Sequence, residues 1–110
     1  AGKTYRFEAN IPTTSNVAGG VKVAIGGTAT ATAIVYDTFI IDSGATTQAT
    51  RAAALGTAGG VTAVTAAFVR IIGTITVNAG GTVVVQFAQN ASSASASSVL
   101  VGATFAVHEF

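Results

Sequence analysis

The chain has no cysteine, methionine or tryptophan, and it has only one proline and one histidine. Without cysteine it can form neither a disulfide framework nor a thiolate-ligated zinc or iron–sulfur site. Charge is also scarce, since 8% of the 110 residues are charged, where about a quarter is usual for a soluble domain. Five cations spread along the sequence do not make a basic patch, so we expect no nucleic-acid partner.

Long hydrophobic runs are missing as well. No stretch of about 20 residues is apolar throughout, so we expect no membrane insertion, and no basic segment followed by an apolar one predicts a signal peptide. Half of the residues are nevertheless hydrophobic, and 17 Thr and 7 Ser supply most of the polarity. High hydrophobicity with little charge argues against intrinsic disorder, and the length fits one domain with one core.

Alternation with a period of two dominates what is present. Residues 5–11 alternate apolar and polar side chains, which predicts a half-buried strand that Pro12 ends. Residues 21–25 repeat the pattern before a Gly-Gly turn. Residues 28–42 are rich in β-formers on both faces, so they predict either one central strand or two strands that meet near Asp37.

The second half of the chain gives further strand signals. Residues 43–60 indicate a long surface loop, with a short strand near its middle as an alternative, and residues 61–65 a brief strand. Residues 67–77 predict a clear strand, and the sequence NAGG at 78–81 predicts a hairpin after which 82–90 return antiparallel. Residues 98–110 predict a last strand with alternate apolar side chains on one face.

Six to eight short strands and no convincing helix predict an all-β fold, an antiparallel jelly-roll-like β-sandwich formed by residues 1–110. The runs 39–41 and 83–85 are apolar on both faces, which is typical of strands covered on both sides. In so small a chain, another subunit is the economical cover. Strand parity gives these candidates for a subunit interface: Tyr36, Phe39, Ile72, Val84, Phe105 and Phe110.

The chemistry-bearing side chains do not form a catalytic pattern. Glu8 and Glu109 are on the terminal strands, where ion pairing with Arg6 or Arg70 is expected. His108 has no nucleophile elbow to serve, and one imidazole makes a poor metal site unless a threefold axis brings three copies together. We therefore predict no catalytic, cofactor or metal site, and no enzymatic activity.

A loop of small polar residues offers one candidate for recognition. Ser92, Ser93 and Ser95 lie in the uncharged segment 91–97, which suggests either a plain flexible tip or a contact with a ligand. The aromatic rings of Tyr5, Tyr36 and Phe68 could stack on a sugar, although packing in a core or an interface is the simpler role.

Several segments resemble a domain of bacteriophage virion proteins. They are TYRFEA at 4–9, GGVKVAI at 19–25, TATAI at 30–34, VRIIGTITV at 69–77, GT at 81–82, VQFAQN at 85–90 and SVLVGA at 98–103. The resemblance extends from Lys3 to Glu109, but members of that family usually have another strand before the Tyr-Arg-Phe segment. The expectation is therefore that this chain is a fragment or that a neighbouring chain covers that edge.

The resemblance implies a homotrimer with a jelly roll of the tumour necrosis factor type. Its implied function is that of a virion structural protein in capsid decoration, a fibre or the tail, which contacts other virion proteins. An alternative is a trimeric knob that binds a host surface glycan for attachment. A third possibility is a bacterial surface or filament subunit, in which edge strands pair between chains.

Overall fold

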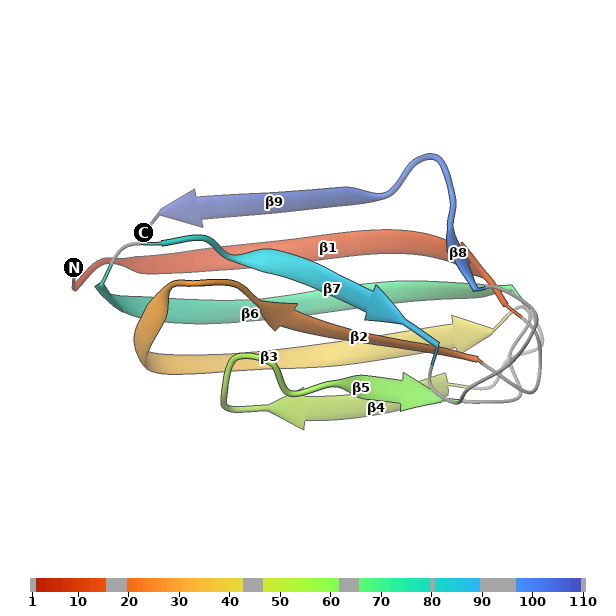
Figure 1. Cartoon of the computed structure of the whole chain (residues 1–110), viewed down its shortest axis with the longest axis horizontal. Coiled ribbons are helices and arrows are strands. Elements are labelled where there is room, and N and C mark those ends of the chain that lie inside the picture. Colours follow the sequence, from red (N-terminus) through yellow and green to blue (C-terminus); the bar gives the residue numbers. More distant parts are fainter. Residues whose placement is uncertain are drawn as a thin grey trace.

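The computed structural model describes residues 2–15, 20–42, 47–61, 66–79, 81–89 and 97–109. Within these residues the chain forms strands and no helix, so the all-β prediction is confirmed (Figure 1). The strands are β1 (Thr4–Thr14), β2 (Val21–Gly26), β3 (Thr30–Asp42), β4 (Thr47–Ala52), β5 (Gly59–Val61), β6 (Ala67–Ala79), β7 (Val84–Ala88), β8 (Ser98–Val99) and β9 (Thr104–Glu109). They number one more than the upper prediction, because two very short strands are among them.

The strands form two sheets that enclose one core, and every strand pairing is antiparallel. The large sheet has the order β4-β3-β6-β1, with β8 and β9 both paired to the far side of β1. The small sheet has the order β5-β2-β7. The two strands that flank β6 are β1 and β3, which come from much earlier in the sequence. Between strands of the large sheet the chain passes repeatedly through strands of the small sheet (Figure 1).

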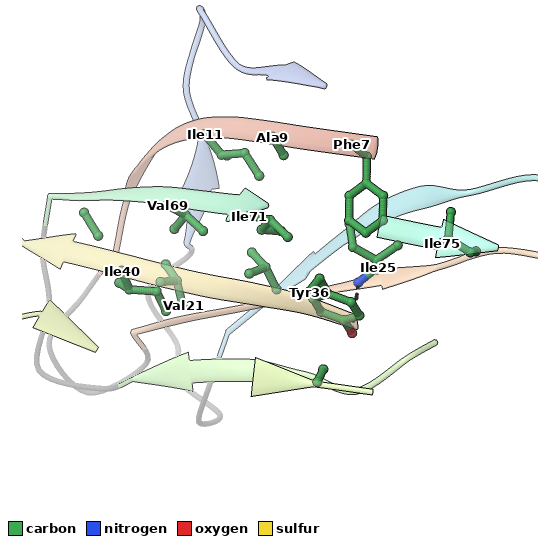
Figure 2. Packing of buried hydrophobic residues seen from close by; sticks show 13 residues of the cluster. Phe7, Ala9, Ile11, Val21, Ile25, Tyr36, Ile40, Val69, Ile71 and Ile75 are labelled. Carbon is green, nitrogen blue, oxygen red and sulfur yellow. Dashed lines mark hydrogen bonds between the residues drawn. The ribbon is translucent and has the colours of Figure 1, made fainter. Parts of the chain in front are cut away.

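The core is built from one face of each sheet, as the alternation predicts. Phe7, Ala9 and Ile11 of β1 are buried, while the side chains between them face outward. They pack with residues of the small sheet and of β3 and β6 (Figure 2). The buried apolar cluster as a whole is Phe7, Ala9, Ile11, Val21, Val23, Ile25, Tyr36, Ile40, Ala52, Ala67, Val69, Ile71 and Ile75.

The segment 28–42 forms one long strand, β3, which begins at Thr30. The prediction of one central strand is therefore confirmed, and its alternative of two strands that meet near Asp37 is wrong. Tyr36 and Ile40 face the core, whereas Val35 and Ile41 are exposed on the other face. Because both faces of this segment are apolar, the sequence pattern did not indicate which face lies toward the core.

Tyr36 is buried within its own subunit, so the prediction that it contributes to a subunit interface is wrong. Its side chain is 1% exposed. The hydroxyl donates to the carbonyl oxygen of Thr57 at 2.6 Å and accepts a longer bond, 3.4 Å, from the N–H of Ile25. Burial raises the pKa of this phenol above its ordinary value. One side chain thus ties β3 to β2 and to the turn that leads into β5.

Pro12 does not end its strand, because β1 continues to Thr14. The carbonyl oxygen of Pro12 accepts a hydrogen bond from the N–H of Leu100 at 2.9 Å. In an antiparallel strand the N–H and C=O of one residue point to the same neighbour. The missing N–H of Pro12 therefore faces the gap between β8 and β9, where the ladder is interrupted and proline is tolerated.

The predicted hairpin at 78–81 is also wrong. Strand β6 pairs with β1 and β3, whereas β7 pairs with β2 in the other sheet. After β6 the chain is held by Thr82, whose carbonyl oxygen accepts from the N–H of Ala29 at 3.0 Å. Contacts with the corner between β2 and β3, which are distant in sequence, override the local turn signal.

Two other segments differ in detail from expectation. The predicted loop 43–60 contains β4, so its alternative, a short strand, is confirmed. The predicted last strand is divided into β8 and β9 by a turn at 100–103, in which Gly102 has φ +101°. Glycine accommodates that left-handed backbone without the strain of a Cβ.

Candidate assembly surface

The two flanks of the sandwich differ. On one flank the chain turns directly from β4 into β5, and a Cβ on Gly59 of β5 would lie 3.3 Å from the Cβ of Thr38 on β3. The small sheet therefore packs closely over the large one there. On the other flank, every residue of β9 is exposed, on both faces of the strand. We call the side bordered by β7, β8 and β9 the open flank (Figure 1).

The open flank exposes large apolar side chains. Phe105 and Val107 of β9 are 36% and 47% exposed, although each is opposite a buried residue of β1 in the register. They therefore face the same side as the core, but the small sheet does not extend over them. The ring of Phe105 contacts that of Phe7 edge-on, with centroids 6.2 Å apart. Val84, Val99 and Val101 are exposed as well.

Two apolar hollows follow the open flank between β7 and β9. One, of about 320 Å³, is lined by side chains of β1, β6 and β9 together with Val83, and Lys3 lies at its edge. The other, of about 240 Å³, lies between Val85 and Phe87 of β7 and Phe105 of β9. At both hollows the large sheet covers the core, but the small sheet does not.

A second apolar patch lies on the outer face of the large sheet, at one end. It consists of Pro12, Ile41, Phe68 and Leu100, which line a shallow hollow together. Ile41 and Phe68 are 45% and 43% exposed. We call these four residues the outer patch.

Ion pairs occupy the middle of that outer face. Arg51 makes a bidentate pair with Asp37, with nitrogen–oxygen distances of 2.7 and 2.8 Å. Arg70 donates to Glu8 at 3.1 Å, which confirms this predicted pair. Hydrogen bonding from Arg51 lowers the pKa of Asp37, and hydrogen bonding from Asn10, with the charge of Arg70, lowers that of Glu8. Both carboxylates are ionised at neutral pH and unsuited to act as general acids.

Glu109 pairs with a different partner from the one predicted. Its carboxylate lies 3.2 Å from the amine of Lys3, not against Arg6 or Arg70. The reason is position, because Glu109 is on the core-side face of β9 and both arginines are on the outer face. Arg6 forms no ion pair within the described residues, and it opposes His108 in the β1–β9 register.

The predicted interface residues do not form one surface. Phe39 and Ile72 are half-buried on the outer face of the large sheet, whereas Val84 and Phe105 border the open flank. Tyr36 is in the core, and Phe110 lies outside the described residues. Sequence reasoning did not select Val107, Val85 or Phe87. The signal for Val107 was the alternation along 98–107, but parity alone does not tell whether the facing sheet reaches that strand.

The remaining predictions concern the serine loop, metal binding and membrane insertion. Ser92, Ser93 and Ser95 lie outside the described residues. Within the described part of the chain, no group of three or more His, Asp or Glu side chains could hold a metal ion. In the same residues there is no helix long and apolar enough to cross a membrane.

Comparison with known protein families, with curated proteins and with solved structures finds no match to this chain. The resemblance to phage virion domains stays a prediction from the residues that carry it.

Proposed function

We propose that the chain is a non-enzymatic structural subunit that assembles with copies of itself, as a homotrimer in a bacteriophage virion. One observation carries the proposal: Phe105 and Val107 lie in line with the core but are left uncovered on the open flank. A subunit that completes its core only on assembly fits a structural role, because obligate interfaces resemble a domain core cut in half.

The energetics favour such an assembly. Burying apolar surface contributes roughly 25 cal/mol per Å² before the unfavourable entropy of association. Desolvation of charge often offsets this gain, but here the described residues 81–89 and 97–107 contain no Asp, Glu, Lys or Arg, and the charges at the end of the flank, Lys3 and Glu109, are paired with each other. The two Arg–carboxylate pairs lie on the outer face, where they stay hydrated.

Virion location is the part of the proposal that rests on the sequence resemblance. Capsid decoration, a fibre or a tail component would each use a rigid, charge-poor β-sandwich whose other partners are virion proteins. The jelly-roll topology belongs to the same proposal. An antibody raised against the chain should label purified phage particles, and labelling of cell envelopes or filaments instead would contradict this location.

Light scattering and native mass spectrometry across a dilution series test the assembly. A trimer that persists to micromolar concentration is the expected result, and a monomer throughout would contradict the proposal. Electron microscopy of the same material should show closed particles, whereas rods would indicate a filament subunit.

A glycan-binding knob is the competing proposal, and its aromatic candidate Tyr36 is buried. A glycan array probed with the purified assembly should show no binding if the role is architectural.

A further inference from the structure

We propose that subunits join by strand pairing across the open flank, with β9 of one copy beside β7 of the next, antiparallel. The inference rests on the proposed function insofar as copies must assemble. It adds which edges meet and how the uncovered core is completed. Each copy supplies one strand to the open flank of its neighbour, so the contact forms only when two copies meet.

The occupant of the open flank must be a β-strand, because both borders are unpaired strand edges. In the described residues β9 pairs with β1 alone, and β7 pairs with β2 alone. Each free edge presents a row of backbone N–H and C=O groups that another strand can satisfy. Side chains by themselves would cover the apolar residues but leave those groups without backbone partners.

The two sheets are staggered in a way that makes a second copy complementary to the first. The large sheet is five strand positions wide, with β8 and β9 sharing the last position, and the small sheet is three wide. Because β5 packs over β3 on the other flank and every residue of β9 is exposed, it is on the open flank that the large sheet projects beyond the small sheet. The projecting β9 of one copy fits the position next to β7 that its neighbour lacks.

Strand direction agrees with this arrangement. Figure 1 shows β7 and β9 running in opposite directions. Rotation about an axis parallel to the strands keeps those directions, so β9 of one copy meets β7 of the next as an antiparallel pair. The same contact closes a ring of two or three copies, and the angle between neighbouring sheets sets the number.

The side chains that would meet are compatible. Phe105 and Val107 would lie beside Val85 and Phe87 of the partner subunit, all on the core side of their sheets. Apart from Glu109, which pairs with Lys3, β7 and β9 contain no Asp, Glu, Lys or Arg, and a second copy of a chain with 8% charged residues suits such a surface better than a charged partner does. The whole flank of a body 41 Å long and 23 Å wide has an outline on the order of 900 Å², so it has room for the roughly 800 Å² per partner of a standard interface.

Other contacts between copies explain less. Pairing β9 with β9 of the partner subunit would extend the large sheet, but it would leave both β7 edges free and the inner face of both β9 strands uncovered. The outer patch has no free strand edge between its residues, and the ion pairs of Glu8 and Asp37 adjoin it.

Cysteine cross-linking tests the pairing directly, because the native chain has no cysteine. Ala106→Cys on β9 is mixed with Val84→Cys, Gln86→Cys or Ala88→Cys on β7, all at exposed positions on the outer side of their sheets. After mild oxidation, one of the three mixtures should give a disulfide between the two variants, because facing residues of paired strands come close enough to bridge. A link of Ala106→Cys to itself, or no link in any mixture, would overturn the inference.

A matched pair of lysine variants separates this inference from the proposed function. Val107→Lys should shift the assembly to monomer by at least tenfold in dissociation constant, while Ile41→Lys, equally exposed but on the outer patch, should leave it intact. The reverse result would overturn the β9–β7 contact and preserve the assembly. A native chain that is monomeric throughout would overturn both. Circular dichroism checks that each variant is folded.

Discussion

A Cβ atom on Gly73 would lie 2.5 Å from the Cβ of Tyr36, on the neighbouring strand of the large sheet. Gly73 also opposes Phe7 on its other side, and the rings of Phe7 and Tyr36 lie with centroids 6.2 Å apart. The absence of a side chain at 73 is thus what allows two aromatic rings to flank β6 in the core. Glycine is needed here for space.

The first prediction concerns this space. Gly73→Ala should lower the free energy of unfolding by about 3 kcal/mol, the upper range for overpacking, because the added methyl also meets backbone. Gly56→Ala is the comparison: its φ is +83° with nothing within 4 Å, so only the backbone penalty of about 1 kcal/mol applies. Urea unfolding at fixed protein concentration measures both, and equal losses would contradict the steric explanation.

The second prediction concerns the Tyr36 hydroxyl. Tyr36→Phe should destabilise the fold by about 1 kcal/mol, because the part-buried hydrogen bond from its hydroxyl to the Thr57 carbonyl oxygen is lost. Tyr5→Phe is the control, since its hydroxyl makes no hydrogen bond within the described residues. Thermal unfolding should separate the two variants, and an unchanged Tyr36→Phe protein would contradict the role assigned to this bond.

The third prediction concerns acid. Asp37 and Glu8 have pKa values that are lower in the folded chain than their ordinary values, so their ionised forms favour folding. That stabilisation is complete above the ordinary values near pH 4 and should be lost as the pH falls through the lower folded-state values. Urea midpoints from pH 7 to pH 2 should therefore fall less steeply for the variant Asp37→Asn with Glu8→Gln. Parallel curves would show that the pairs do not contribute.

The fourth prediction concerns hydrogen exchange at the open flank. In the assembly, the backbone amides at the free edges of β7 and β9 should exchange slowly. Dilution below the dissociation constant should raise their exchange rates. Amides of β6 serve as the control, because β6 is paired on both sides within one chain. Equal exchange of β9 at all concentrations would argue against a strand beside it.

Sequence reasoning worked where a single strand decides the outcome. The alternation of Phe7, Ala9 and Ile11 with polar neighbours gave both the strand and its buried face, because the polar side chains must reach water. It failed where two distant segments compete. The NAGG signal at 78–81 gave way to contacts of Thr82 with the β2–β3 corner, and Pro12 was tolerated because of a gap in the partner strands.

The candidate surface shows the same division. Sequence alone determined that this chain is β-structured, poor in charge and half apolar, because these properties depend only on composition and period. Tertiary structure decided which apolar residues are left over: Tyr36 is buried, while Phe105 and Val107 are not. The physical reason is the extent of the small sheet, which stops short of β9, and no pattern within β9 itself records how far another sheet reaches.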